Sequence, residues 1–115
     1  MLHRILADMV KLEGVNVVAV VGRDGFVIEH MSNIKMDADA LGAMASTSVG
    51  TSEAMGLELG KGGFDQVLVE LENGPIMLSL ISENEILAIV AAKGSNIGRI
   101  RYEARKNKDR IVAAL

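Results

Sequence analysis

The sequence contains no cysteine and no tryptophan, only one proline, and just two phenylalanines and one tyrosine among 115 residues. Without cysteine the chain has no thiol nucleophile and cannot form disulfide bonds, zinc–thiolate sites or iron–sulfur clusters. The scarcity of aromatic side chains argues against a large ligand pocket, because such pockets are usually lined by them. The interior must therefore be built mainly from aliphatic side chains.

Long hydrophobic runs are also missing. The longest purely apolar run, residues 86–92, is far shorter than the roughly 20 residues with which a helix spans a bilayer. The N-terminal residues Met1-Leu2-His3-Arg4-Ile5 lack the charged region followed by an apolar core that marks a signal peptide. We therefore expect a cytoplasmic protein with no membrane span.

Hydrophobic residues nevertheless make up 50% of the chain, and its mean hydropathy is +0.30. A length of 115 residues is close to the commonest domain size, so residues 1–115 are expected to form one domain. A small monomer has difficulty hiding this much apolar surface, whereas a symmetric partner would cover the excess. The composition therefore predicts a homodimer, with a ligand pocket as the competing explanation.

Positive charge is concentrated at the C-terminal end. From residue 97 onward six basic residues stand against two acidic ones, a net charge of +4, whereas residues 1–96 carry −7. Arg101, Arg105 and Lys108 could bind nucleic acid or an anionic membrane, or they could form a solvated face. Because Tyr102 is the only nearby aromatic residue that could stack on bases, we expect a solvated or partner-facing surface and no nucleic acid.

The chain begins with helical periodicity and then changes to β patterning. The apolar residues that recur at helical spacing are Leu2, Ile5, Leu6, Met9 and Leu12. Gly14 follows them, where a helix cap in the left-handed conformation favours glycine. Residues 15–22 are apolar on both alternating faces, which predicts a strand buried on both sides. Residues 26–31 contain Glu29 and His30 and are expected to form an edge strand.

A long middle helix is predicted for residues 38–59, with Asp37 as its N-terminal cap. Its expected inward stripe consists of Leu41, Met44, Ala45, Ser48, Ser52, Met55 and Leu59. The helix also contains Gly42, Gly50 and Gly56, each of which costs about 1 kcal/mol relative to alanine. Its stability must therefore come from packing, and its small residues would let another backbone approach closely.

Three strands and a helix are predicted for the rest of the chain. Residues 64–72 alternate in polarity, Asn73-Gly74 is a strong hairpin signal, and strands follow at 76–81 and 86–92. Asn96 can cap a last helix, whose expected inward residues are Ile97, Ile100, Ala104, Ile111 and Leu115. The order α-β-β-α-β-β-β-α predicts an α/β (α+β) fold of three layers. A five-stranded, mainly antiparallel sheet would have the first and last helices on one face and the middle helix on the other.

Three segments resemble the Roadblock (dynein light chain) family. They are Gly14-Val15 leading a strand into Gly22-Arg23-Asp24-Gly25-Phe26-Val27-Ile28, the helix around Ala40-Leu41-Gly42-Ala43, and the strand-to-helix junction Ala92-Lys93-Gly94-Ser95-Asn96-Ile97-Gly98-Arg99-Ile100-Arg101. The resemblance covers essentially the whole chain in the family's element order. It implies a profilin-like fold and a homodimer joined through the third strand and the middle helix. It also implies the regulation or scaffolding of small GTPases, which the similar gliding-motility members activate.

The resemblance gives two sets of candidate contact residues on the third strand and the middle helix. The residues predicted for the homodimer interface are Leu41, Ala45, Gly50, Val67, Leu68 and Val69. The exposed side of the middle helix is expected to bind the GTPase, because a two-fold pair of such helices forms one broad surface. The residues predicted for that contact are Ser46, Thr47, Thr51 and Glu53.

A phosphate-binding loop is excluded by two residues. Gly60-Lys61 matches part of the motif, but the motif requires a glycine at position 55 and a serine or threonine at position 62. Met55 and Gly62 stand there instead. The segment also follows a helix and does not join a strand to one. We therefore expect the protein to bind no nucleotide itself and to need no cofactor.

Catalytic and metal-binding residues are not predicted either. His3 and His30 have no companions at metal-ligand spacing and are expected at the surface. Asp37 and Asp39 are better explained as a helix cap and its dipole-stabilised neighbour than as an acid–base pair. No serine has a recognisable base and orienting group.

The predicted function is therefore that of a homodimeric, non-catalytic regulator or scaffold that binds a small Ras-like GTPase. Stimulation of GTP hydrolysis is one form that such regulation takes. The alternative is a small-molecule sensory domain of profilin-like or PAS-like fold, which would need an interior cavity.

Overall fold

The computed structural model describes residues 1–115. It contains three helices and five strands in the predicted order. Their bounds are α1 Leu2–Val10, β1 Val15–Gly22, β2 Val27–Ser32, α2 Ala38–Glu58, β3 Gln66–Leu71, β4 Gly74–Leu80, β5 Glu85–Ala91 and α3 Ile97–Ala113. Every predicted helix and strand is present, with its ends within one or two residues of the prediction.

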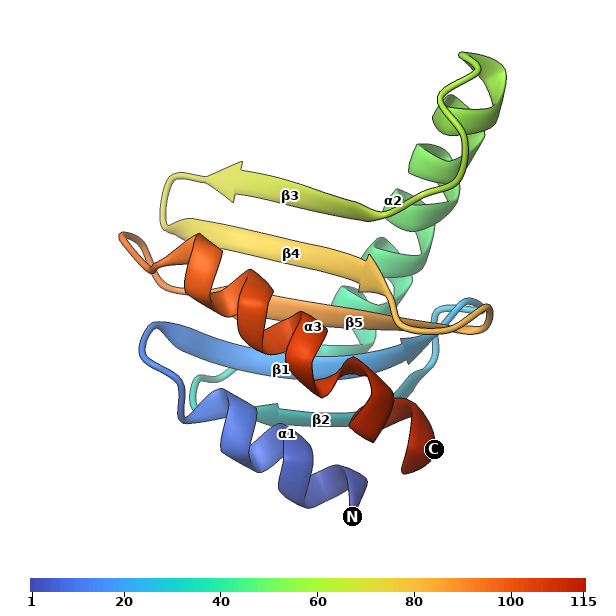
Figure 1. The fold of residues 1–115 in the computed structure, drawn as a ribbon. Coiled ribbons are helices and arrows are strands. Elements are labelled where there is room, and N and C mark those ends of the chain that lie inside the picture. Colours follow the sequence, from blue (N-terminus) through green and yellow to red (C-terminus); the bar gives the residue numbers. More distant parts are fainter.

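All five strands form one antiparallel sheet with the order β2-β1-β5-β4-β3 (Figure 1). The pairs β1–β2, β3–β4 and β4–β5 join strands that follow one another in the sequence. The remaining pair joins β1 to β5 in an antiparallel register that runs from Val15↔Ala91 to Gly22↔Glu85. The two strands predicted to be apolar on both faces thus lie side by side in the interior of the sheet.

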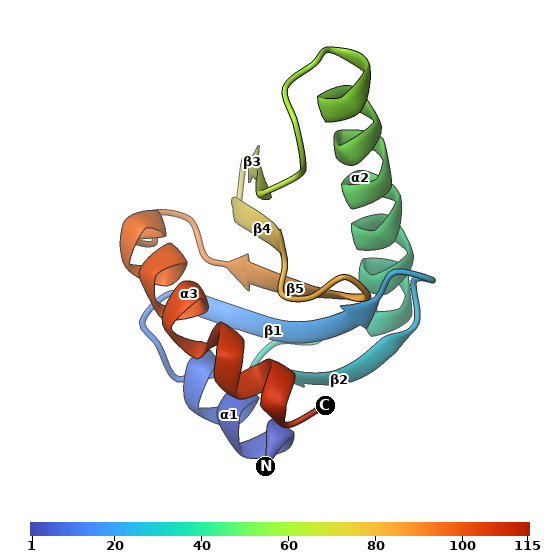
Figure 2. The same ribbon diagram turned by 45° about the vertical axis from the view of Figure 1, so that its right-hand side comes forward.

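Helices cover both faces of the sheet, which gives three layers (Figure 2). α1 and α3 pack on one face over a core cluster of 15 buried residues. α2 packs on the other face, where the cluster contains 9 buried residues. Alternate residues of β1 divide between the two clusters, with Val18 and Val20 in the first and Val17 and Val21 in the second. The predicted assignment of helices to faces is confirmed.

Polar side chains cap α2 and α3 as predicted. Asp37 Oδ1 accepts a hydrogen bond from the backbone N–H of Ala40 at 3.0 Å. Asn96 Oδ1 accepts one from the backbone N–H of Arg99, also at 3.0 Å. Gly14 has a φ of +85°, in the left-handed region predicted for it. It lies in the turn beyond α1, because that helix ends at Val10.

The prediction for the end of the last helix is wrong. Leu115 is 48% exposed, because α3 ends at Ala113 and the chain then leaves the sheet. Asn107 occupies an inward position instead and is only 7% exposed. Its Nδ2 donates to the carbonyl of Glu103 at 2.8 Å, and its Oδ1 accepts from Arg110 Nη1 at 2.8 Å. The buried amide is tolerated because both of its ends are hydrogen-bonded.

We expect Gly74, at the turn into β4, not to tolerate a side chain. Its φ is +128°, and a Cβ there would lie 2.2 Å from the carbonyl oxygen of Ala91. Gly74→Ala should lower the free energy of unfolding by about 1–3 kcal/mol, the usual cost of a sparsely populated backbone conformation. Urea titration followed by circular dichroism at fixed protein concentration measures this loss.

The matched control is Gly63→Ala. Gly63 lacks a positive φ, and no heavy atom lies within 4 Å of the position of its Cβ. Its substitution should change the free energy of unfolding by less than about 0.5 kcal/mol. Equal losses in the two variants would contradict the assigned turn geometry.

Candidate protein-interaction surface

The outer edge of β3 is an unpaired strand edge. β3 pairs with β4 in an unbroken register from Gln66↔Ser79 to Leu71↔Gly74, and no strand lies on its other side. Its middle carries three consecutive apolar residues that are half-buried, Val67, Leu68 and Val69. A regular, apolar edge of this kind offers a row of free backbone N–H and C=O groups to another strand.

The opposite edge of the sheet, β2, is built differently. A β-bulge interrupts its pairing with β1, since Val20 pairs with Glu29 but Val21 pairs with Val27. Ile28 is left without a partner in this register and is 49% exposed. A bulge and charged side chains are the usual means by which an edge strand resists further pairing. β3 is therefore the edge at which the sheet is open to extension.

α2 crosses the sheet and continues beyond β3 (Figures 1 and 2). Its buried residues are Leu41, Gly42, Ala45 and Val49, all in the first part of the helix. No residue of α2 after Val49 is buried. The second half of the helix therefore projects past the edge strand with no sheet beneath it.

The predicted inward stripe of this helix is correct at Leu41 and Ala45 but wrong at Met44 and at the apolar residues that follow Val49. Met44, Met55 and Leu59 are 62%, 55% and 69% exposed, although the prediction placed them inward. Leu59 lies 14 residues after Ala45, close to four helical turns, so it faces the same side of the helix. For Met55 and Leu59 the periodicity gave the correct side, but the sheet ends at β3 and leaves these later residues uncovered. Met44 lies over the sheet but points away from its buried neighbours Leu41 and Ala45.

The side of α2 that faces away from the sheet carries small residues. Ala43, Thr47, Gly50, Thr51 and Ala54 are all exposed. The hydroxyls of Thr47 and Thr51 donate to the carbonyls of Ala43 and Thr47, each at 2.9 Å, so they are satisfied within the helix. A Cβ at Gly50 would have no heavy atom within 4 Å. We call these five residues the outer face of α2.

Ser46 and Glu53 have partners within the chain. The Ser46 hydroxyl donates to the carbonyl of Arg23, and the Arg23 guanidinium forms an ion pair with Glu53. Arg23 Nη1 also donates to the carbonyl of Glu83 at 3.4 Å. These contacts fasten the β1–β2 turn to the middle of α2. Of the four residues predicted to bind a partner, Thr47 and Thr51 lie on the outer face, whereas Ser46 and Glu53 hold this turn.

The residues predicted for a homodimer interface fall into three groups. Leu41 and Ala45 are 7% and 2% exposed in the core under α2, so their side chains are already covered. Gly50 lies on the outer face of α2. Val67, Leu68 and Val69 lie on the open edge. Of these six residues, only Val67, Leu68 and Val69 lie at the uncovered edge of the sheet, past which the exposed Met55 and Leu59 of α2 project.

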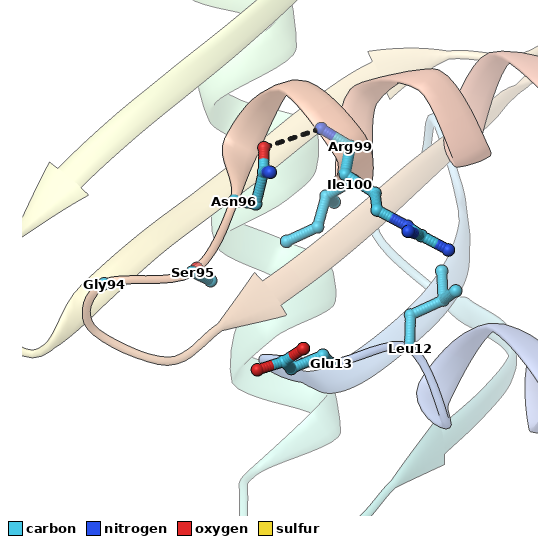
Figure 3. Close-up of a pocket in the computed structure, with 7 residues that line it drawn as sticks. All are labelled: Leu12, Glu13, Gly94, Ser95, Asn96, Arg99 and Ile100. Carbon is cyan, nitrogen blue, oxygen red and sulfur yellow. Dashed lines mark hydrogen bonds between the residues drawn. The ribbon is translucent and has the colours of Figure 1, made fainter.

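The surface also carries a cavity near α3 and two exposed histidines, outside the open edge and α2. A cavity of about 440 Å³ lies between the end of α1 and the start of α3, where Glu13 and Arg99 are among its lining residues (Figure 3). The polar groups of its loop bond to the chain itself, since Asn96 caps α3 and the Ser95 hydroxyl donates to the carbonyl of Ala92 at 2.6 Å. His3 and His30 are exposed, as predicted.

The structure also offers no metal-binding cluster and no helix suited to spanning a membrane. No three His, Cys, Asp or Glu residues come together in a way that could hold a metal ion. None of the helices has both the length and the apolar character that crossing a membrane requires. Lys61 is exposed and follows the C-terminal end of α2. Phosphate groups bind at the opposite end of a helix, where free N–H groups point outward.

Comparison with known proteins identifies the fold and the family. The fold closely matches a Roadblock/LC7 domain from Streptomyces avermitilis, with a TM-score of 0.90 and 20% identity, covering 97% of this chain and 95% of that one. Myxococcus xanthus MglB gives a TM-score of 0.88 at 16% identity, covering 99% and 96%. A profilin from Schizosaccharomyces pombe gives 0.69 at 12% identity, covering 99% and 98%, which confirms the profilin-like fold.

Sequence comparison agrees with the fold. Protein MJ0310 of Methanocaldococcus jannaschii is 34% identical over 113 residues, which cover 98% of both chains. The model of the Roadblock/LC7 domain matches residues 1–91. The chain therefore belongs to the Roadblock/LC7 family.

Proposed function

We propose that the protein is a homodimeric, non-catalytic regulator or scaffold that binds a small Ras-like GTPase. The observation that carries the proposal is the continuity of two uncovered features, the open edge of β3 and the overhanging half of α2. Both lie at the same border of the molecule (Figure 2). A single symmetric partner would cover them together.

In the proposed dimer the two β3 strands pair antiparallel and join the sheets into one. The second half of each α2 helix then lies over the partner's sheet. This covers Met55 and Leu59, which are 55% and 69% exposed in the single chain. Val67 and Val69 face the same layer, because Val67 packs with the cluster under α2 and alternate residues of a strand share a face. Pairing of the edges also satisfies the free backbone groups of β3.

The outer face of α2 is the proposed contact for the GTPase. It stays exposed when α2 packs on the sheets, since it lies on the side of the helix opposite the buried residues. Two antiparallel copies double its area. Small side chains there let the backbone of a partner approach closely. The family resemblance to gliding-motility regulators supports a GTPase as that partner, and one structure of similar fold is described as a gliding protein from Thermus thermophilus.

The first test of this proposal is the oligomeric state. Light scattering after size exclusion should give about twice the monomer mass of 12.2 kDa at micromolar concentration. Met55→Glu combined with Leu59→Glu should convert the dimer to a folded monomer, because both side chains are exposed in the single chain and would bury two charges on dimerisation. A dimer that persists in this double variant would remove the overhang from the interface.

Leu57→Glu provides the control for that experiment. Leu57 is 76% exposed on the same end of α2 but points to a different side of the helix from Met55 and Leu59. Its substitution adds a charge to the same region without entering the proposed contact. The mass of this variant should remain that of the dimer.

GTPase binding tests the second half of the proposal. Thr47→Arg combined with Thr51→Arg should weaken binding to a Ras-like GTPase loaded with a non-hydrolysable GTP analogue by roughly 100-fold, since disrupting the centre of an interface costs about 2–4 kcal/mol. Calorimetry measures the affinity, and the protein alone should hydrolyse no GTP. Candidate GTPases are best taken from the same organism.

The control places two charges on a different helix. Arg99→Glu combined with Lys106→Glu alters exposed side chains of α3, on the opposite face of the sheet from α2. GTPase affinity should be unchanged in this variant. The reverse pattern of effects would move the contact to α3, and GTP hydrolysis that is lost in Lys61→Ala would refute the non-catalytic assignment.

A further inference from the structure

We propose that the two β3 strands pair with Leu68 on the two-fold axis, and that Arg101 of each protomer forms an ion pair with the partner's Glu70. The inference rests on the proposed dimer and specifies its strand register. It assigns a role to the basic flank of α3, which the proposed GTPase contact leaves unused.

The two faces of β3 limit the possible registers. Gln66, Leu68 and Glu70 alternate onto the face covered by α3, and Leu68 packs with the core cluster of that face. Val67 packs with the cluster on the α2 face. A two-fold axis perpendicular to the sheet keeps each face on its own side, and directly opposed residues of antiparallel strands share a face. The axis must therefore lie at the position of one residue, so that this residue is opposite its own copy. An axis midway between residues 68 and 69 would place Leu68 opposite the partner's Val69, whose side chain points to the other face of the sheet.

Two registers then remain that align most of the strand. With Leu68 on the axis, Leu68 meets its own copy, Val67 meets the partner's Val69, and Gln66 meets the partner's Glu70. With Val69 on the axis, Leu68 would instead face the carboxylate of the partner's Glu70. The first register keeps apolar residues together in the middle and polar residues at the ends. Cross-strand pairs of this kind are what stabilise a sheet.

Arg101 lies beside Gln66, which the register centred on Leu68 places opposite the partner's Glu70. With the Gln66 amide oxygen turned toward the guanidinium, Arg101 Nε and Nη2 donate to it at 2.8 and 2.9 Å. Arg101 has no acidic partner in its own chain, whereas the neighbouring Arg105 approaches Asp65 at 3.9 Å. Glu70 is exposed and forms no ion pair in its own chain. Each protomer thus presents one unpaired charge of each sign at opposite ends of the same edge.

Because the dimer is symmetric, the contact between Arg101 and the partner's Glu70 occurs twice. Directly opposed side chains have Cβ atoms about 5 Å apart, well within the reach of an arginine on the adjacent helix. The dimer would contain two such ion pairs, one at each end of the strand ladder. In the register centred on Val69, the same arginine would face the partner's Glu72. The identity of the acidic partner therefore reports the register.

The absence of cysteine allows a direct test by cross-linking. Leu68→Cys should form a disulfide-linked dimer under mild oxidation, because the two copies of residue 68 are directly opposed. Val69→Cys should not, since its copies would be offset by two residues and their Cα atoms would exceed the roughly 7 Å that a disulfide can bridge. Non-reducing electrophoresis compares the two variants. Cross-linking at 69 and not at 68 would overturn the proposed register.

A charge-reversal experiment tests the ion pair without altering the core. Arg101→Glu and Glu70→Arg should each weaken the homodimer by roughly 10-fold, since each places two like-charged pairs in the interface. Mixing the two variants should produce mainly heterodimers, because each mixed dimer restores two opposite-charge pairs. Native mass spectrometry distinguishes the species by mass. Arg99→Glu, on the flank of α3 away from β3, serves as the control and should show no preference for Glu70→Arg.

The outcomes separate this inference from the dimer on which it rests. A statistical mixture, with about half of the dimers mixed, would overturn the ion pair while the dimer stands. Preference of Arg101→Glu for Glu72→Arg would overturn the register in favour of one centred on Val69. A wild-type chain that is monomeric by light scattering would instead refute the proposed function.

Discussion

The open edge of β3 sets the main constraint on this structure. Burying a backbone N–H or C=O group without a hydrogen-bond partner costs free energy, so the edge of an apolar strand must either stay in contact with water or pair with another strand. The other edge, β2, is protected by a bulge beside Glu29, whereas β3 pairs with β4 without interruption. The sheet can therefore grow in only one direction. The position of that edge also decides which part of α2 lies over its own sheet.

α2 has properties that fit a helix shared between two sheets. Its first half is held by close packing, and a Cβ on Gly42 would lie 2.5 Å from the carbonyl oxygen of Gly25. Its second half contains glycine, serine and threonine, which favour helix only weakly, and it has no buried residue after Val49. Most helical stability in proteins comes from packing of an apolar side. A partner's sheet beneath Met55 and Leu59 would supply what the single chain lacks.

The two layers divide the proposed roles between them. The α2 layer carries the outer face proposed to bind the GTPase, and the α3 layer carries Arg101, which is proposed to fix the register of the dimer. Arg101 is one of six basic residues in the segment from residue 97 onward, which carries a net charge of +4, whereas residues 1–96 carry −7. Arg101 and Glu70 would attract one another only between protomers, which favours pairing of the chain with itself.

The sequence by itself determined the local structure and the side of each element that faces the core. Periodicity and turn chemistry reveal features that depend only on neighbouring residues. These features are the strands β1 and β5 with two apolar faces, the Asn73-Gly74 turn, and the helix caps Asp37 and Asn96. The tertiary structure alone decided that β1 pairs with β5 and that Arg23 binds Ser46 and Glu53. Those contacts join residues far apart in the chain. The tertiary structure also decided that β3 is the edge of the sheet, so that no strand lies beneath Met55 of α2. Helical periodicity gives the direction of a side chain but not the width of the sheet beneath it.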